Sequence, residues 1–283
     1  MSAPNPNIPL ELLTEFKKLG IPASKLETFA TVEDKQIYSL VTPGAKAIGL
    51  WENLRSVVDR TGFWPLVMGQ DAGPWERSDL ETSAPITASW MATLKKHTGK
   101  NYDEALGVSG MILKAGLELD AQAWLKKHRL PDPTAEDDEW ADLAEEIGTE
   151  SPASKPNTIF ASVADSLSGK PLPEVTIALW PTKEGWEVPA LMRYGGWNAC
   201  PLPHLHVALM RRWKNKYDAE LVAIAGDIVE LRVGNPPGSP EAALELAREH
   251  YSYCDDIVTQ GTMTLERLAE VLINGSVWYF WWD

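Results

Sequence analysis

The sequence predicts an α+β fold in which helices flank a mixed β-sheet, built as one large domain or as two closely packed lobes. The chain has 283 residues, 44% of them hydrophobic and 23% charged, a composition typical of globular proteins with a sizeable core. Short apolar runs alternate with segments whose apolar residues recur at helical spacing. Near the N-terminus these segments follow each other as strand, helix and strand, an order that suits a sheet covered by helices.

The first half of the chain is predicted to be mainly helical, with this strand–helix–strand unit inside it. Gly20 and Gly62 each follow an apolar-periodic segment and mark where a helix ends. Helices are expected at 8–19, 45–60, 87–97 and 117–128, and strands at 36–41 and 63–68. The segment 107–116 is ambiguous between helix and other structure.

The second half is predicted to mix strands and helices more evenly. Gly226-Asp227 is a turn dipeptide that joins two apolar runs into a hairpin. Ser239 and Thr264 are expected to cap helices. Strands are expected at 175–180, 188–192, 220–225, 228–233 and 277–282, and helices at 203–217, from 240 onward and at 265–272.

Residues 149–157 form the best candidate linker, because they contain two prolines among small polar residues. This interpretation divides the chain into a mainly helical N-terminal region, 1–150, and an α+β C-terminal domain, 158–283.

Charge is concentrated in one segment. The 26 basic and 40 acidic residues give a net charge of −14, which argues against general nucleic-acid binding. Residues 132–150 are predicted to form an amphipathic helix that carries nine carboxylates and no basic residue. This helix is either a solvated surface or a docking face for a basic partner. Its candidate partner-binding residues are Glu136, Asp137, Asp138, Glu139, Asp142, Glu145 and Glu146.

The sequence favours a cytoplasmic location and no membrane segment. The start MSAPNPNIPL lacks the apolar stretch of a secretory signal. The longest apolar run, Val277 to Trp282, is far shorter than the ~18–20 residues of a membrane-spanning helix. The two cysteines are expected to be reduced thiols in this compartment.

Thirteen tryptophans are the main oddity of the composition. The final strand contributes several of them, and alternation directs Trp278, Phe280 and Trp282 to one face and Tyr279 and Trp281 to the other. Because large aromatic side chains stabilise a fold mainly when they are buried, this segment is predicted to be chiefly a core strand.

Two segments are candidates for a ligand-binding pocket. The loop Gly195, Gly196, Trp197 and Asn198 combines backbone freedom with a stacking face and an amide. The segment after Tyr251 adds the polar groups of Tyr253, Asp255, Asp256 and Gln260, and His206 completes the candidate set. The alternative is structural, with a strained turn that anchors Trp197 and carboxylates that bind backbone amides.

Cysteine and histidine also suggest two kinds of chemistry. Cys200, His204 and His206 resemble a metal set, but helical spacing places the two histidines ~200° apart. A thiolate at Cys200 or Cys254 with a histidine base at 204, 206 or 250 is a further possibility, although no nucleophile signature surrounds either thiol. We therefore assign no catalytic residue, metal ligand or cofactor.

Several motifs in order resemble the bacterial domain-of-unknown-function family 4253. They are GGWNACP, HVALMRRW, YDAELVAIAGDIVELRV, AREHYSYCDDIVTQGTMTL and WYFWWD. The resemblance covers about 175–283. The resemblance implies a small α+β domain of the bacterial cytosol and carries over no catalytic residues. The pattern residues that fit it are Gly195, Gly196, Trp197, Asn198, His206, Trp213, Tyr217, Glu220, Tyr253, Cys254, Gln260 and 278–283.

Two functional hypotheses follow. The first is a non-enzymatic protein-binding module, such as an immunity protein that neutralises a basic toxin through an acidic, tryptophan-rich surface. The second is an enzyme or a small-ligand or metal-binding protein with a pocket between the Gly195–Asn198 loop and the Tyr253–Gln260 segment.

Overall fold

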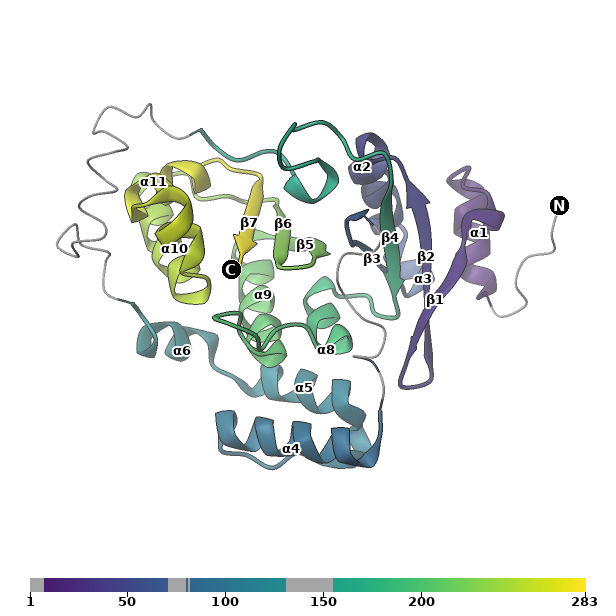
Figure 1. Ribbon diagram of the computed structural model, residues 1–283, viewed down its shortest axis with the longest axis horizontal. Coiled ribbons are helices and arrows are strands. Elements are labelled where there is room, and N and C mark those ends of the chain that lie inside the picture. Colours follow the sequence, from purple (N-terminus) through teal and green to yellow (C-terminus); the bar gives the residue numbers. More distant parts are fainter. Residues whose placement is uncertain (1–7, 71–79, 81, 131–154) are drawn as a thin grey trace.

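A mixed sheet forms the centre of the computed structural model, which describes residues 8–70, 80, 82–130 and 155–283. The seven strands lie in the order β1-β2-β4-β3-β5-β6-β7 (Figure 1). Their bounds are β1 Glu27–Val32, β2 Lys35–Thr42, β3 Trp64–Val67, β4 Val175–Trp180, β5 Ala219–Ala225, β6 Ile228–Val233 and β7 Val277–Trp281.

The centre of this sheet joins strands from distant parts of the chain. Strand β3 lies between β4 and β5, antiparallel to the former and parallel to the latter. The other neighbouring pairs are antiparallel. The sheet thus contains strands from both sides of the expected linker at 149–157, and the predicted α+β class with a mixed sheet is confirmed.

Helices pack on the sheet and on each other. Predicted caps are in place, since the hydroxyl of Ser239 accepts from the Ala242 amide and that of Thr264 from the Arg267 amide. The α-helices are α1 Leu10–Lys18, α2 Gly44–Arg55, α3 Val58–Thr61, α4 Ala84–Thr98, α5 Gly107–Glu118, α6 Ala121–Lys127, α8 Val188–Met192, α9 Pro203–Tyr217, α10 Pro240–Tyr253 and α11 Leu265–Leu272. Two shorter helices matter below, the 3₁₀-helix η5 Ala161–Val163 and the π-helix η7 Ile257–Thr262.

Four expectations for local structure need correction. The helix expected at 117–128 is interrupted at Leu119 and Asp120, between the end of α5 and the start of α6. Val188–Met192 is the helix α8 rather than a strand, with Pro189 in its first turn, where proline is well tolerated. The helix expected at 45–60 divides at Val57 into α2 and α3. Strand β1 was not predicted. It pairs with β2 through a turn at Glu33 and Asp34, whose φ angles of 44° and 67° are left-handed.

The strand β7 is a core strand with the predicted alternation. Trp278, Phe280 and Trp282 are at most 1% exposed, whereas Tyr279 and Trp281 are half-buried on the other face. The ring of Trp213 in α9 lies 5.8 Å from Trp278 and 5.5 Å from Phe280, measured between ring centroids. Aromatic contacts therefore hold α9 against β7.

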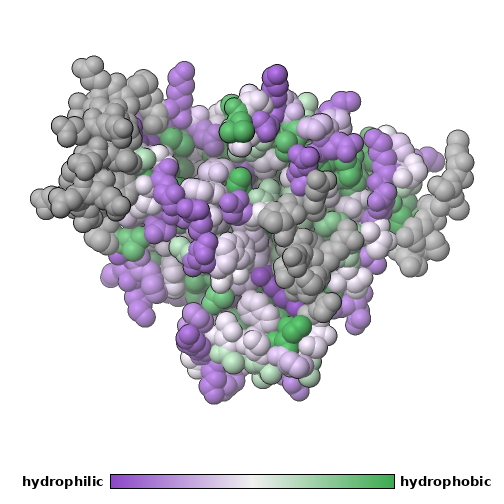
Figure 2. All heavy atoms as spheres, viewed as in Figure 1, coloured by the Kyte–Doolittle hydropathy of each residue, from purple (hydrophilic) through white to green (hydrophobic). Residues whose placement is uncertain are grey.

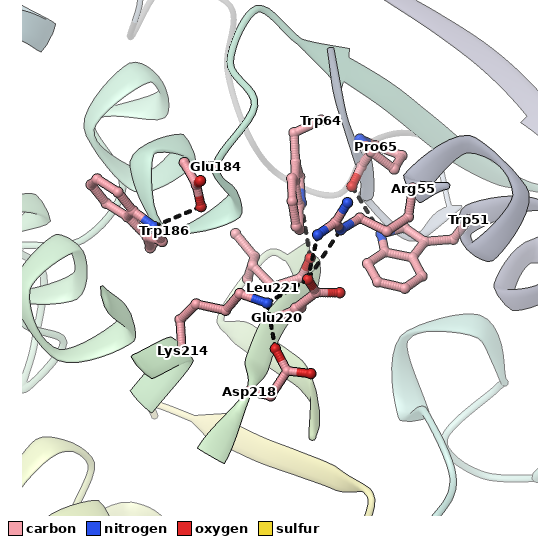
Figure 3. A network of polar contacts seen from close by, with 10 residues as sticks. All are labelled: Trp51, Arg55, Trp64, Pro65, Glu184, Trp186, Lys214, Asp218, Glu220 and Leu221. Carbon is pink, nitrogen blue, oxygen red and sulfur yellow. Dashed lines mark hydrogen bonds and ion pairs between the residues drawn. The ribbon is translucent and has the colours of Figure 1, made fainter. Parts of the chain in front are cut away.

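A network of polar contacts connects the early helix α2 to the later part of the sheet (Figure 3). The carboxylate of Glu220 in β5 accepts from Arg55 in α2 and, at 2.8 Å, from Lys214 in α9. The Arg55 guanidinium also lies 4.6 Å from the ring centroid of Trp64, and the indole of Trp64 donates to the Leu221 carbonyl. These contacts fix the start of β3 beside the start of β5, and the large pocket described below lies at the other end of these two strands.

The surface is mixed in polarity. Figure 2 shows hydrophilic side chains over much of one face, with hydrophobic residues in separate small patches. No helix in the described part of the chain has the length and apolar character needed to cross a membrane.

Candidate functional site

The two segments expected to form a pocket meet around Asp283. The Asn198 amide donates to the Asp283 carbonyl at 2.6 Å, and the Asp283 amide donates to the Asp256 carboxylate at 3.0 Å. Gln260 donates to the other oxygen of Asp256 at 2.9 Å. The predicted polar groups are therefore close together, and their hydrogen bonds hold the end of β7.

The space between these segments is filled by Trp282. Its ring centroid lies 5.7 Å from that of His206 and 5.3 Å from that of Tyr253. Gly195 lies against the same cluster, because a Cβ placed on it would be 2.7 Å from Nε2 of His206. Asp255 remains half-buried beside η7, where its main-chain carbonyl accepts from Val258.

The imidazole of His206 is buried within a hydrogen-bonded chain. Its Nδ1 lies 2.5 Å from the Tyr253 hydroxyl, and its Nε2 lies 3.6 Å from the Cys200 sulfur. The imidazole also donates to the Pro201 carbonyl, which raises its pKa but is outweighed by burial, so that the pKa falls to about 3. Nδ1 is occupied by the Tyr253 hydroxyl, so Nε2 is the ring nitrogen that bonds to the Pro201 carbonyl. Since a carbonyl only accepts, Nε2 carries the proton and Nδ1 accepts from Tyr253.

Both cysteines are free and buried. Burial raises the pKa of the Cys200 thiol far above its usual range, and it raises that of Cys254 to about 12. The Cys254 thiol donates to the Trp281 carbonyl at 3.0 Å. Neutral thiols beside an imidazole that already bears its Nε2 proton do not form an activated nucleophile.

The possible metal ligands are not brought together as a set. His204 lies on another side of α9 from His206, with its ring centroid 6.4 Å from that of His97, as the helical spacing predicts. Burial, together with the neighbouring His97, lowers the pKa of His204 to about 4. Within the residues that the structure describes, no three histidine, cysteine or carboxylate side chains are placed to hold a metal ion.

The largest pocket described has a volume of about 1020 Å³ and lies where β3 and β5 end. Met68 and Gly69 follow β3, and Gly226 and Asp227 form the turn between β5 and β6. Ligands of α/β proteins commonly bind beyond the carboxyl ends of parallel strands. Residues of the segment 159–172 and the rings of Tyr194, Trp197 and Tyr279 also line the pocket.

The charged groups around this pocket differ in accessibility. The Arg193 side chain is 3% exposed, donates to the Thr82 hydroxyl at 2.7 Å and lies 3.7 Å from the Glu33 carboxylate. Asp165 and Asp227 are exposed. The Ser168 hydroxyl and amide donate to Asp165 and hold the pKa of its carboxyl below the usual range. Asp227 accepts from the Trp281 indole at 2.8 Å.

The buried Glu230 in β6 holds one wall in place. Its two carboxylate oxygens accept from the amides of Ala161 and Ser162, at 2.6 Å and 3.1 Å. Burial raises the pKa of Glu230, and these hydrogen bonds oppose that rise. The 3₁₀-helix η5, whose Ala161 and Ser162 line the pocket, is thereby attached to the sheet.

A second, smaller pocket of about 400 Å³ lies along β7, beside η7 and α11. It shares Ile159, Ala161 and Tyr279 with the large pocket. The lining includes the predicted residue Asp256 and is otherwise largely apolar.

The predicted site residues are thus divided between a structural cluster and the pocket walls. Trp197 lines the large pocket and Asp256 the small one, whereas Gly195, Gly196, Asn198, His206, Tyr253, Asp255 and Gln260 line neither. Sequence reasoning missed Asp165, Arg193, Tyr194 and Tyr279 as pocket residues. Asp227 could have been suspected from the sequence, because the Gly226-Asp227 turn directly follows the strand predicted at 220–225.

The acidic candidates Glu136, Asp137, Asp138, Glu139, Asp142, Glu145 and Glu146 lie outside the described residues. The structure therefore leaves their role as a partner-binding surface a prediction.

Comparisons with known proteins bear on the C-terminal part of the chain. No curated protein and no solved structure matches the chain. Residues 176–283 match the family model described as Domain of unknown function (DUF4253), which confirms the resemblance over nearly the expected range.

Proposed function

We propose that this protein binds a small molecule in the large pocket at the ends of β3 and β5. The observation that carries the proposal is the pocket itself, whose volume of about 1020 Å³ is at the upper end of the range of ligand sites in proteins. Its position beyond the parallel strands is the usual place for such sites.

The lining supports a ligand with an apolar body and a few polar groups. Phe160, Tyr194, Trp197 and Tyr279 provide aromatic surface, and Trp197 is 37% exposed. Asp165 and Asp227 place carboxylates beside these rings. A binding role is favoured over covalent catalysis by the Cys200–His206 pair, since its thiol and its imidazole are both buried and neutral.

A pocket-filling variant tests this proposal. Ser166 is exposed and lines the pocket, so Ser166→Trp is expected to fill part of it without disturbing the core. Lys170→Trp places the same side chain at an exposed position of the same segment that does not line the pocket. Fragments that raise the melting temperature of the wild-type protein and of Lys170→Trp, but not of Ser166→Trp, support the proposal. A diverse fragment library with no such member contradicts it.

A second candidate function is protein binding by the acidic segment, as for an immunity protein of the bacterial cytoplasm. Its support is the sequence alone, in which residues 132–150 hold nine carboxylates without a basic residue. Reversal of the charges between Glu136 and Glu146 is expected to abolish capture of a basic partner from the native lysate. Failure to recover any partner, or capture that charge reversal leaves intact, argues against this function.

A further inference from the structure

We propose that the large pocket accepts a small organic cation, an ammonium or guanidinium group on an apolar or aromatic body. The inference rests on the proposed ligand-binding function and specifies its chemistry. It depends on which charges face the pocket and on which aromatic rings lie beside them.

The accessible charges among the described lining residues are negative. Asp165 and Asp227 both line the pocket and are exposed, one on the segment 159–172 and the other in the β5–β6 turn. The hydrogen bonds from Ser168 involve only Oδ1 of Asp165, and the one from Trp281 involves only Oδ2 of Asp227. Because these donors are neutral, their hydrogen bonds do not cancel the negative charge of either carboxylate.

The basic residue in the described lining, Arg193, is directed to other groups. Its side chain is 3% exposed, and it contacts Thr82 and Glu33. An anionic ligand would have to compete with Glu33, whose carboxylate also accepts from the Ser109 amide at 2.8 Å. The same anion would face Asp165 and Asp227, so like-charge repulsion disfavours it.

Aromatic rings provide the second part of a cation site. Trp197 lines the pocket, is 37% exposed and packs edge-on against Tyr194, with ring centroids 4.8 Å apart. Burial raises the pKa of Tyr279 to about 12, with nearby Glu230 and Asp227 adding to the rise, so its phenol is neutral at physiological pH. Cations bind over the faces of such rings, most strongly over tryptophan. Carboxylates and aromatic faces around one cavity therefore favour an organic cation over a neutral or anionic ligand of the same shape.

A matched set of ligands tests the inference by calorimetry or ligand-observed NMR. Phenylethylamine, phenylethanol and phenylacetate share an aromatic body and differ in charge. We expect the amine to bind at least about fivefold more tightly than the alcohol, and the acid to bind most weakly. Added salt is expected to reduce the advantage of the amine.

Variants assign this preference to the pocket. Asp227→Asn and Asp165→Asn retain side-chain acceptors for their neighbours and are expected to lower the amine-to-alcohol ratio severalfold. Asp255→Asn, outside the pocket, is expected to leave the ratio unchanged.

Equal binding of the amine and the alcohol, or preferred binding of the acid, overturns the inference while the ligand-binding function stands. Lack of binding by all three also overturns it, whereas the proposed function itself fails only when the fragment library yields no ligand sensitive to Ser166→Trp.

Discussion

The Tyr253 hydroxyl lies 2.5 Å from Nδ1 of His206, and both side chains are buried. Because the other ring nitrogen, Nε2, donates to the Pro201 carbonyl, the hydroxyl is the donor in this contact. The contact joins α9 to α10, and both rings pack against Trp282. Two residues that the sequence offered as ligand contacts thus stabilise the end of the final strand.

Replacement of Tyr253 by phenylalanine leaves Nδ1 of His206 buried without its donor. We expect Tyr253→Phe to lower the free energy of unfolding by about 1–3 kcal/mol, the usual cost of an unsatisfied buried polar atom. Urea denaturation monitored by circular dichroism measures this change. Tyr102→Phe is the control, since the buried Tyr102 hydroxyl has no hydrogen-bond partner in the described structure and its removal is expected to cost little. Equal effects of the two substitutions would contradict the role assigned to the His206–Tyr253 bond.

The two thiols are expected to be unreactive in the folded protein. Both are buried, and burial raises their pKa values, to about 12 for Cys254. Since the thiolate is the reactive form, a disulfide reagent such as Ellman's reagent should label neither cysteine at neutral pH and both after unfolding in urea. Rapid labelling of the native protein at Cys200 would instead support the thiol nucleophile that the structure disfavours.

Acid is expected to destabilise the fold through three buried histidines. Burial lowers the pKa to about 3 for His206 and His250 and to about 4 for His204. Unfolded histidine has a pKa near ~6.5, so between these values the unfolded state binds protons that the folded state does not. The free energy of unfolding is therefore highest above about pH 6.5 and falls as the pH decreases, by about 1.4 kcal/mol per pH unit for each fully titrating histidine.

Urea titrations between pH 5 and pH 7.5 measure this dependence. His250→Gln removes one of the three groups and is expected to reduce the slope by about one proton. His128→Gln, at an exposed position, provides the control. A slope that His250→Gln leaves unchanged would show that this side chain takes up its proton in the folded state as readily as in the unfolded one.

Most secondary structure could be predicted because local signals agreed with the tertiary context. Pro203 and Ser239 marked helix starts that the structure shows, and Gly226-Asp227 marked the β5–β6 turn. The strand prediction for Val188–Met192 was wrong because five mainly apolar residues suit a strand or a buried helix equally well. In the fold, β4 is already paired on both edges, and the segment packs as α8 against α9.

The candidate site was harder to predict, because it depends on contacts distant in sequence. The motif residues of the Gly195 loop and of the Tyr253–Gln260 segment do meet in the fold. The sequence does not show, however, that Trp282 fills the space between them. The pocket requires β3 to lie beside β5, and no local pattern specifies this parallel pairing of Val67 with Ala223, 156 residues later in the chain. The segment 159–172, which Glu230 attaches to the sheet, has no periodic pattern of apolar residues that would predict its place in the lining.

Gly195 offers a direct test of how tightly the His206 cluster is packed. Its φ angle is +106°, and a Cβ there would lie 2.0 Å from the Pro201 carbonyl oxygen and 2.7 Å from Nε2 of His206. Gly195→Ala therefore requires a shift of the 195–201 backbone as well as an unfavourable φ. Gly20 has a φ of +70° with open space around it, so Gly20→Ala measures the conformational cost alone, about 1–2 kcal/mol. We expect Gly195→Ala to exceed this cost clearly in urea denaturation and to expose Cys200 to Ellman's reagent. Equal losses of stability in the two variants, with Cys200 still protected, would mean that the His206 cluster accommodates the added methyl group without further loss of stability.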